Sequence, residues 1–219
     1  MLGRTQDMMG QGLLKYLFHI THIENLPIIV QTGGLMCDSR KIELVSPPIS
    51  IAYEDIKDKR TKKQVLCGPG GCIADYVPFY FAPQSPMLYT ISRGNVPDRR
   101  QDDIVYLVSA IEWVVERNLG YIFTDGHPIM AFTSFYDNLD DLANIDWNVM
   151  KAKIWHDTDA DPDRKRRRQA EFLVHEFLPW ELIQYICVMN ENAGKAVEEI
   201  IDGLEHHPTI FVKRRWYYG

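Results

Sequence analysis

The sequence predicts one α+β domain over residues 1–219, in which strands and helices mix without strict alternation. Three observations support this class. Short runs of branched and aromatic residues are typical of strands, as at residues 16–20 and 121–124. Amphipathic stretches at residues 110–117 and 192–204 are typical of helices. The length and the 46% hydrophobic content suffice for a single substantial core.

The first helix is expected directly after the first strand. Thr21 and Glu24 have the spacing of a capping box, so the helix is predicted over residues 22–32 and ends before two glycines. Pro27 lies a turn inside this helix and removes one backbone hydrogen bond, which predicts a kink or a loose first turn. Residues 1–12, ahead of the strand, are expected to be flexible.

The other elements are predicted from hydrophobic periodicity and from the glycine, proline and polar residues that separate helices and strands. We expect strands over residues 77–81, 87–91, 104–108, 170–174, 182–189 and 209–212. We expect helices over residues 50–63 and, in two pieces, over residues 135–155. Loops are expected at residues 36–48, 68–71 and 156–164.

Basic residues gather in three clusters although the net charge is −6. They lie at residues 57–63, 164–168 and 213–215, whereas the acidic residues lie largely elsewhere. Any one such run could be a solvated surface. Phosphates respond to local potential rather than to net charge, so three runs on an acidic protein slightly favour an anionic ligand.

The sequence predicts no membrane contact and no metal site. No apolar run approaches the roughly 18 residues of a membrane-spanning helix, and the N-terminal residues lack the layout of a signal peptide. We therefore expect a cytoplasmic protein. Cys67 and Cys72 do not have the spacing of a zinc site, so the four cysteines are expected to be reduced thiols.

Glu171 is the first candidate for chemistry, because it follows a charged loop and precedes the apolar stretch of a predicted strand. A carboxylate at the mouth of a strand can face a cleft. The local sequence alone favours a different interpretation, in which Glu171 lies at the surface and pairs with one of the preceding arginines.

Two histidines and a tyrosine are further candidates. A ring nitrogen of His19 or His22 could bind a sugar or a carboxamide, although a structural role is the commoner outcome for both. Tyr80 could offer its ring for stacking, but its aromatic neighbours favour a core position. The chain has no GxGxxG, no GxxxxGKS/T and no GxSxG motif, so any use of NAD⁺ requires a fold other than the Rossmann fold.

As an ordered set, seven phrases of the chain resemble the DarT family, the toxins of DarTG toxin–antitoxin systems. The phrases are FHITHIENL (18–26), IAYEDI (51–56), DYVPFYF (75–81), SPMLY (85–89), FTD (123–125), QAEFLV (169–174) and WYY (216–218). They span nearly the whole chain in the order of the family, which makes the resemblance specific.

The resemblance implies an ADP-ribosyltransferase fold, with a split central β-sheet and flanking helices, that holds NAD⁺ in a cleft as co-substrate and uses no metal. The catalytic residues of the family fall on Glu171 and Arg60, with Lys59 as the alternative to Arg60. The implied NAD⁺-binding residues are His19, Thr21, Tyr80 and Arg60. The implied contacts to substrate DNA are His127, Arg164, Arg166, Arg167 and Arg168.

The implied chemistry suits these residue types. Breaking the bond between nicotinamide and ribose develops oxocarbenium character, which the Glu171 carboxylate would stabilise. Glu171 could also remove the ring N–H proton of a thymine and make that nitrogen nucleophilic. Arg60 would balance charge on the diphosphate or on the deprotonated base. Attack needs an exposed base, which favours single-stranded DNA over duplex.

The resemblance also implies partners and leaves alternatives open. The implied partners are single-stranded DNA and the antitoxin DarG, whose macrodomain strips the modification, in a system for growth control and phage defence. We expect a monomer when the chain is free. The implied function is an NAD⁺-dependent transfer of ADP-ribose to a base in single-stranded DNA, with release of nicotinamide, and thymine is the favoured base. The alternatives are that the same fold modifies guanine in DNA, or an RNA or protein acceptor. The alternative of another class is an inactive nucleic-acid-binding module.

Overall fold

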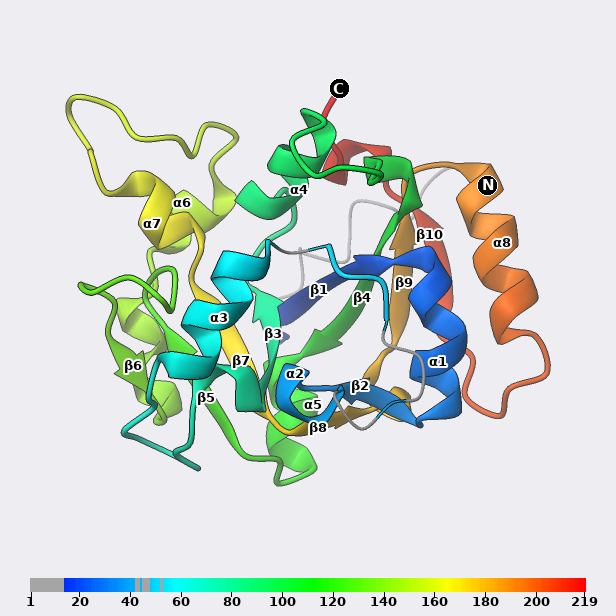
Figure 1. Ribbon diagram of the computed structural model, residues 1–219, viewed down its shortest axis with the longest axis horizontal. Coiled ribbons are helices and arrows are strands. Elements are labelled where there is room, and N and C mark those ends of the chain that lie inside the picture. The colour runs from blue at the N-terminus through cyan, green and yellow to red at the C-terminus, as the bar shows by residue number, and fades with distance from the viewer. Residues whose placement is uncertain (1–13, 42–43, 45–47, 52) are drawn as a thin grey trace.

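The computed structural model describes residues 14–41, 44, 48–51 and 53–219 (Figure 1). The expected flexible segment at residues 1–12 lies outside these ranges, as does part of the loop expected at residues 36–48. The described residues combine strands and short helices in irregular order, which confirms the α+β class.

An eight-stranded sheet in the order β10-β9-β4-β1-β3-β7-β5-β6 forms the centre of the molecule (Figure 1). Its strands, in that order, are Thr209–Val212, Tyr185–Val188, Ile104–Ala110, Tyr16–His22, Tyr76–Tyr80, Glu171–His175, Tyr121–Thr124 and Phe135–Tyr136. Neighbours are antiparallel except for the parallel pair β9–β10. A separate antiparallel ribbon joins β2 (Gly34–Met36) and β8 (Phe177–Pro179).

Eight α-helices surround the sheet in the described part of the chain. They are α1 (Leu26–Gln31), α2 (Asp38–Lys41), α3 (Glu54–Lys62), α4 (Pro86–Ser92), α5 (Ile111–Glu116), α6 (Trp147–Lys151), α7 (Arg164–Arg168) and α8 (Glu191–Ile201). Short 3₁₀ turns occupy residues 23–25, 73–75, 101–103, 139–144, 180–182 and 214–216.

The sheet is split between β1 and β3. In the described residues these strands pair at Phe18 and Tyr80, whereas β1 pairs with β4 along its whole length. Beyond the Phe18–Tyr80 pair the two strands diverge, and the His19 ring bridges the split by a 2.8 Å hydrogen bond from Nδ1 to the Pro78 carbonyl. The expected split central sheet is therefore present, and it opens a site in the middle of the molecule.

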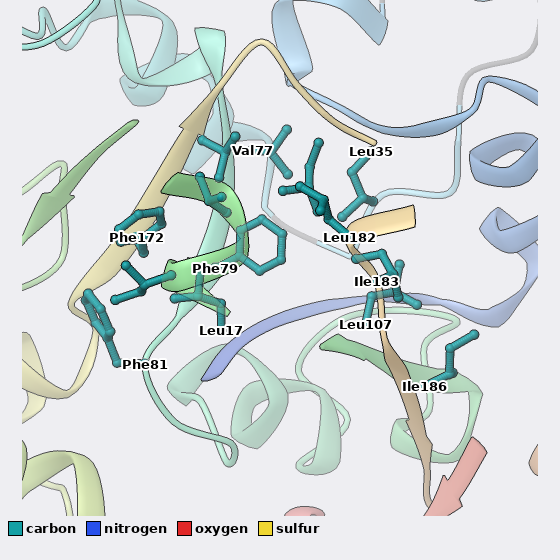
Figure 2. Close-up of a cluster of buried hydrophobic side chains, with 14 of the residues drawn as sticks. Leu17, Leu35, Val77, Phe79, Phe81, Leu107, Phe172, Leu182, Ile183 and Ile186 are labelled. Atoms are coloured by element: carbon teal, nitrogen blue, oxygen red, sulfur yellow. The ribbon is translucent and has the colours of Figure 1, made fainter. Parts of the chain in front are cut away.

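Strand alternation builds a hydrophobic core on each side of the sheet. Figure 2 shows the larger cluster, in which Leu17, Phe79 and Phe172 come from three different strands. Phe123 stacks on Phe172 with the ring planes 2° apart. Phe18, the neighbour of Leu17, belongs to a second cluster on the opposite side. The strands that flank the split are thus held rigidly from both faces.

The strand expected at residues 87–91 is wrong, because this segment is helix α4. The Ser85 side chain accepts a hydrogen bond from the Leu88 N–H, and Pro86 occupies the first turn, where its missing N–H is harmless. The branched and aromatic composition favoured a strand, but the Ser-Pro start determines a helix.

The capping box expected at Thr21 is also absent. His22 caps the turn at residues 23–25 by accepting from the Glu24 N–H, and Thr21 instead accepts from the Asn25 side chain. Pro27 lies in the first turn of α1, which begins only after this 3₁₀ turn. A proline in the first turn removes no helical hydrogen bond, so Pro27 requires no kink. The 3₁₀ turn at residues 23–25 corresponds to the loose first turn that was the other expected outcome.

Two other helical segments are shorter than expected. The helix predicted over residues 50–63 begins at Glu54. The segment over residues 135–155 breaks into β6, a 3₁₀ turn and α6. The side chains of Asn138 and Asp146 cause these breaks, because each accepts hydrogen bonds from backbone N–H groups that follow it.

The C-terminal tail fastens the polar loop of residues 152–163 to the segment that follows β3. The Tyr218 hydroxyl lies 2.6 Å from the Gln84 carbonyl oxygen and accepts a hydrogen bond of 3.1 Å from Trp155 Nε1. Gln101 binds the backbone of Tyr218 from the other side. One hydroxyl therefore joins three segments that are distant in sequence.

Replacing Tyr218 by phenylalanine is expected to lower the free energy of unfolding by about 1–3 kcal/mol. The buried Trp155 N–H loses its acceptor while the ring packing stays. Tyr89→Phe is the matched control, because Tyr89 packs on both Trp155 and Tyr218 but its hydroxyl makes no hydrogen bond in the described part of the chain. Urea denaturation compares the two variants, and equal losses would contradict a role for the Tyr218 hydroxyl.

Candidate active site

A cavity of about 740 Å³ lies at the split in the sheet. Its lining includes seven of the residues expected from the sequence, drawn from strands, two helices and a loop: His19, Thr21, Arg60, Tyr80, His127, Arg166 and Glu171. The volume falls within the roughly 300–1,000 Å³ typical of ligand-binding pockets. Segments far apart in the sequence therefore form one site.

Glu171 is held at the start of β7 with its side chain in the cavity. It is 4% exposed and lies opposite Tyr80 in the pairing of β7 with β3. Its backbone N–H donates to Thr124 Oγ1 at 3.1 Å. The surface position favoured by the local sequence is thus wrong, because the short helix α7 directs the chain inward before β7 begins.

Arg60 lies in the last turns of α3 and forms a buried ion pair with Glu171. Its Nη1 is 3.0 Å from one carboxylate oxygen and 3.3 Å from the other. Arg60 Nη2 is buried and has no hydrogen-bond partner in the described part of the chain. Lys59, the alternative to Arg60, is largely exposed and pairs with Asp55, so α3 brings Arg60 to the carboxylate.

His19 lies in β1 with 9% of its surface exposed. Burial lowers the pKa of His19 to about 4, so the ring is neutral at physiological pH. In the neutral ring, the hydrogen bond to the Pro78 carbonyl places the proton on Nδ1 and leaves Nε2 as an acceptor. His19 can therefore accept a hydrogen bond from a hydroxyl or an amide in the cavity.

Because the pKa of His19 is lower in the folded chain, the unfolded chain binds this proton first and acid lowers stability. The free energy of unfolding is expected to fall as the pH drops from about 6.5 towards 4. His19→Asn keeps a donor near Nδ1 and does not titrate. Between about pH 7 and pH 5 this variant should therefore lose less free energy of unfolding than the natural chain, by on the order of 2 kcal/mol. Urea denaturation at both pH values measures this difference, and parallel losses in the two proteins would contradict the assignment.

Asn25 supports this part of the site and was not predicted. It is 5% exposed, and its Nδ2 donates to Thr21 Oγ1 at 3.0 Å and to the Ile49 carbonyl at 2.9 Å. Its Oδ1 accepts from the Ile49 N–H at 2.7 Å. The side chain thus fastens residues 48–51 to β1. Asn25 belongs to the FHITHIENL phrase, and this was the feature of the sequence that could have identified it as a site residue.

Tyr80 and His127 complete the inner wall of the cavity. Burial and the charge of Glu171 raise the pKa of Tyr80, so its hydroxyl stays protonated and can donate. Burial lowers the pKa of His127. A Cβ at Gly126 would lie 2.2 Å from Arg166 Nη1, so any larger residue there would require the Arg166 side chain to shift.

The loop that carries His127 is tied to α7. The His127 N–H donates to the Arg166 carbonyl at 3.0 Å, and Arg166 Nη1 donates to Asp125 Oδ1 at 3.0 Å. Thr133 Oγ1 donates to the His127 carbonyl at 2.8 Å. The loop of residues 125–134 and α7 therefore form one side of the cavity mouth together.

The four arginines of α7 make polar contacts within the protein. Arg164 binds Asp161 and the Ile154 carbonyl, Arg166 binds Asp125, Asp163 and Thr133, Arg167 binds Asp146, Asp161 and Asp163, and Arg168 binds the carbonyls of Pro83, Val149 and Met150. Arg168 is 4% exposed, so the expected contact between its guanidinium and DNA does not fit its position.

Only Arg166 of these four arginines is among the described residues that line the cavity. Lys165 also lines it and forms no salt bridge in the described ranges, although it was not among the predicted site residues.

The described ranges of the chain contain no group of three His, Cys, Asp or Glu side chains that could hold a metal ion. Within them, no helix combines the length and apolar character needed to cross a membrane.

A family model described as DarT, ssDNA thymidine ADP-ribosyltransferase, matches residues 18–218. The chain belongs to the DarT family. A DNA ADP-ribosyl transferase of Thermus sp. (strain 2.9) is 38% identical over 207 residues, which cover 92% of this chain and 95% of that relative. This membership confirms the expectation of an NAD⁺-dependent DNA ADP-ribosyltransferase.

Solved structures of the DarT family have the same fold. Thermus sp. 2.9 DarT in complex with ADP-ribosylated ssDNA has a TM-score of 0.87 at 36% identity, with 93% of this chain and 96% of that chain covered. The complex of that DarT with NAD⁺ has a TM-score of 0.83 at 35% identity, with 93% and 98% covered. A DNA ADP-ribosyl transferase–DNA ADP-ribosyl glycohydrolase fusion protein of Thermosipho africanus is 25% identical over 86% of this chain and 46% of its own length.

Proposed function

We propose that this DarT family member transfers ADP-ribose from NAD⁺ to a thymine base in single-stranded DNA and releases nicotinamide. The observation that carries the proposal is the buried Arg60–Glu171 pair in a cavity of ligand size. A carboxylate held by one arginine and shielded from water is suited to a reaction that develops positive charge on a sugar.

The donors and acceptors of the cavity suit NAD⁺. Arg60 Nη2 is a buried donor without a partner in the described residues, and a diphosphate oxygen would satisfy it. His19 Nε2 is an acceptor that suits an amide or a ribose hydroxyl. Thr21 and Tyr80 line the same space. Bound NAD⁺ supplies the activated bond between nicotinamide and ribose.

Glu171 has two roles in this proposal. Its negative charge stabilises the sugar carbon C1′ as the bond to nicotinamide breaks and the bonding electrons leave with neutral nicotinamide. The same carboxylate accepts the ring N–H proton of thymine, whose nitrogen then forms the new bond to C1′. Arg60 fixes the carboxylate through Nη1 and leaves Nη2 for the substrate.

The DNA side of the site is proposed at the mouth formed by the 125–134 loop and α7. Lys165 lines this mouth, forms no salt bridge in the described residues and offers positive charge to a phosphate backbone. Arg166 lines it too, but its charge is paired with Asp125 and Asp163. His127 lies deeper and can contact the base. Arg164, Arg167 and Arg168 would act indirectly, because their internal contacts hold α7 in place.

The partner proposed for this chain is an antitoxin that removes ADP-ribose from DNA. The Thermosipho fusion protein supports it, since its name joins the transferase to a DNA ADP-ribosyl glycohydrolase in one chain. In this proposal the chain is a toxin that acts in the cytoplasm as a monomer.

Incubation with NAD⁺ and oligonucleotides, read by mass, tests the proposal. The oligonucleotides differ at one position, which holds either thymine or guanine. We expect a mass gain of one ADP-ribose on the single strand with thymine, and no gain on the strand with guanine or on duplexes. Glu171→Ala should abolish the gain. NAD⁺ hydrolysis without any DNA product would exclude DNA as acceptor, and complete absence of NAD⁺ turnover would favour the inactive binding module.

A further inference from the structure

We propose that Phe132 is a stacking platform for the unpaired base that neighbours the modified base, an inference that rests on the proposed function. Phe132 is 86% exposed although it lines the cavity. Met130, 45% exposed, lines the cavity beside it. The Phe132 ring is therefore available to a ligand rather than packed in the core.

Hydrogen bonds hold the backbone of the 125–134 loop, which carries Phe132, in place. Its ends are joined by the hydrogen bonds from the Ser134 N–H to Asp125 Oδ1 and from the Asp125 N–H to the Ser134 carbonyl. The Met130 N–H donates to the His127 carbonyl inside the loop. Arg166 binds Asp125 and Thr133, so the loop cannot move independently of α7. An aromatic side chain has only two side-chain torsions, so it loses little conformational entropy when a base stacks on it.

Positive charge beside this loop favours an anionic ligand. Lys57 and Lys165 line the same cavity and form no salt bridge in the described part of the chain. Proteins that bind single strands combine such cations, which contact phosphates, with aromatic rings on which bases stack. Glu171 lies within the same cavity, so a strand whose target base enters it passes the mouth with its next base near Phe132.

Phe132→Ala is expected to raise the KM for a single-stranded oligonucleotide and its dissociation constant about tenfold, the usual effect of one lost base–aromatic contact. The kcat at saturating DNA and the KM for NAD⁺ should stay unchanged. Phe132→Trp should keep the KM for the oligonucleotide at the value of the natural chain. Leu66→Ala is the matched control, because Leu66 is 96% exposed and is not among the residues that line the cavity.

Abasic substitution identifies the base that stacks. The test uses an oligonucleotide with one thymine, from which either the 5′ or the 3′ flanking base is removed. At one of these two positions the removal should raise the dissociation constant of the natural chain about tenfold. The same removal should not change the dissociation constant of Phe132→Ala. Equal effects in both proteins, or unchanged binding by Phe132→Ala, would overturn the platform. Because fluorescence anisotropy measures binding without catalysis, Phe132-dependent binding without transfer would instead refute the proposed function alone.

Discussion

Replacing Glu171 by glutamine is expected to lower kcat for ADP-ribose transfer by roughly a thousandfold or more. Glutamine has the size of glutamate and retains an oxygen that can accept from Arg60 Nη1. It lacks the negative charge that stabilises the sugar and the basicity that removes the thymine proton. Transfer to a thymine oligonucleotide at saturating NAD⁺ and DNA measures the effect.

The Glu171→Gln result is interpreted beside two controls. Thermal unfolding should show a folded variant, because the hydrogen bond to Arg60 can persist. Glu181→Gln removes a carboxylate from an exposed position outside the cavity lining and should leave kcat unchanged. Retention of more than about a tenth of the activity by Glu171→Gln would mean that neither the charge nor the basicity of Glu171 is essential.

Arg60→Lys is expected to lower kcat/KM for NAD⁺ by roughly a hundredfold to a thousandfold. Lysine keeps a positive charge near Glu171, so the buried carboxylate is not left without a counter-ion. It cannot present two planar N–H groups, one towards Glu171 and one towards the substrate, as Arg60 does. Initial rates over a range of NAD⁺ concentrations measure the effect.

Lys59→Ala provides the matched control for the Arg60 variant. Lys59 is the preceding residue and also lines the cavity, but its ion pair is with Asp55 rather than Glu171 and is solvent-exposed. Its replacement should change kcat/KM less than about twofold, since exposed ion pairs contribute little. A larger loss in Lys59→Ala than in Arg60→Lys would transfer the proposed role to Lys59.

The sequence predicted those site residues that its ordered motifs identify without knowledge of the fold. The ordered phrases located His19, Tyr80 and Glu171, and all three line the cavity. Most strands were also predicted, because alternation is visible in a short window. The error at α4 arose where composition and capping disagree, since Ser85 and Pro86 start a helix in residues that otherwise favour a strand.

The partners of charged residues could not be predicted in the same way. The basic run 164–168 indicates positive charge, but its neutralising carboxylates include Asp125 and Asp146, which lie outside the run. Only the fold brings these groups together, and it leaves Lys165 free of salt bridges in the described residues. The contribution of Asn25 was hidden for the same reason, because its partner Ile49 follows two intervening helices and a ribbon strand.

Arg60 and Glu171 are separated by 111 residues along the chain, and this separation determines when activity can arise during folding. Contacts between such distant residues form late, because the intervening chain must first be ordered. A chain that has not yet positioned β7 beside β3 has no assembled catalytic pair. A newly synthesised molecule therefore passes through an inactive interval before it can modify DNA.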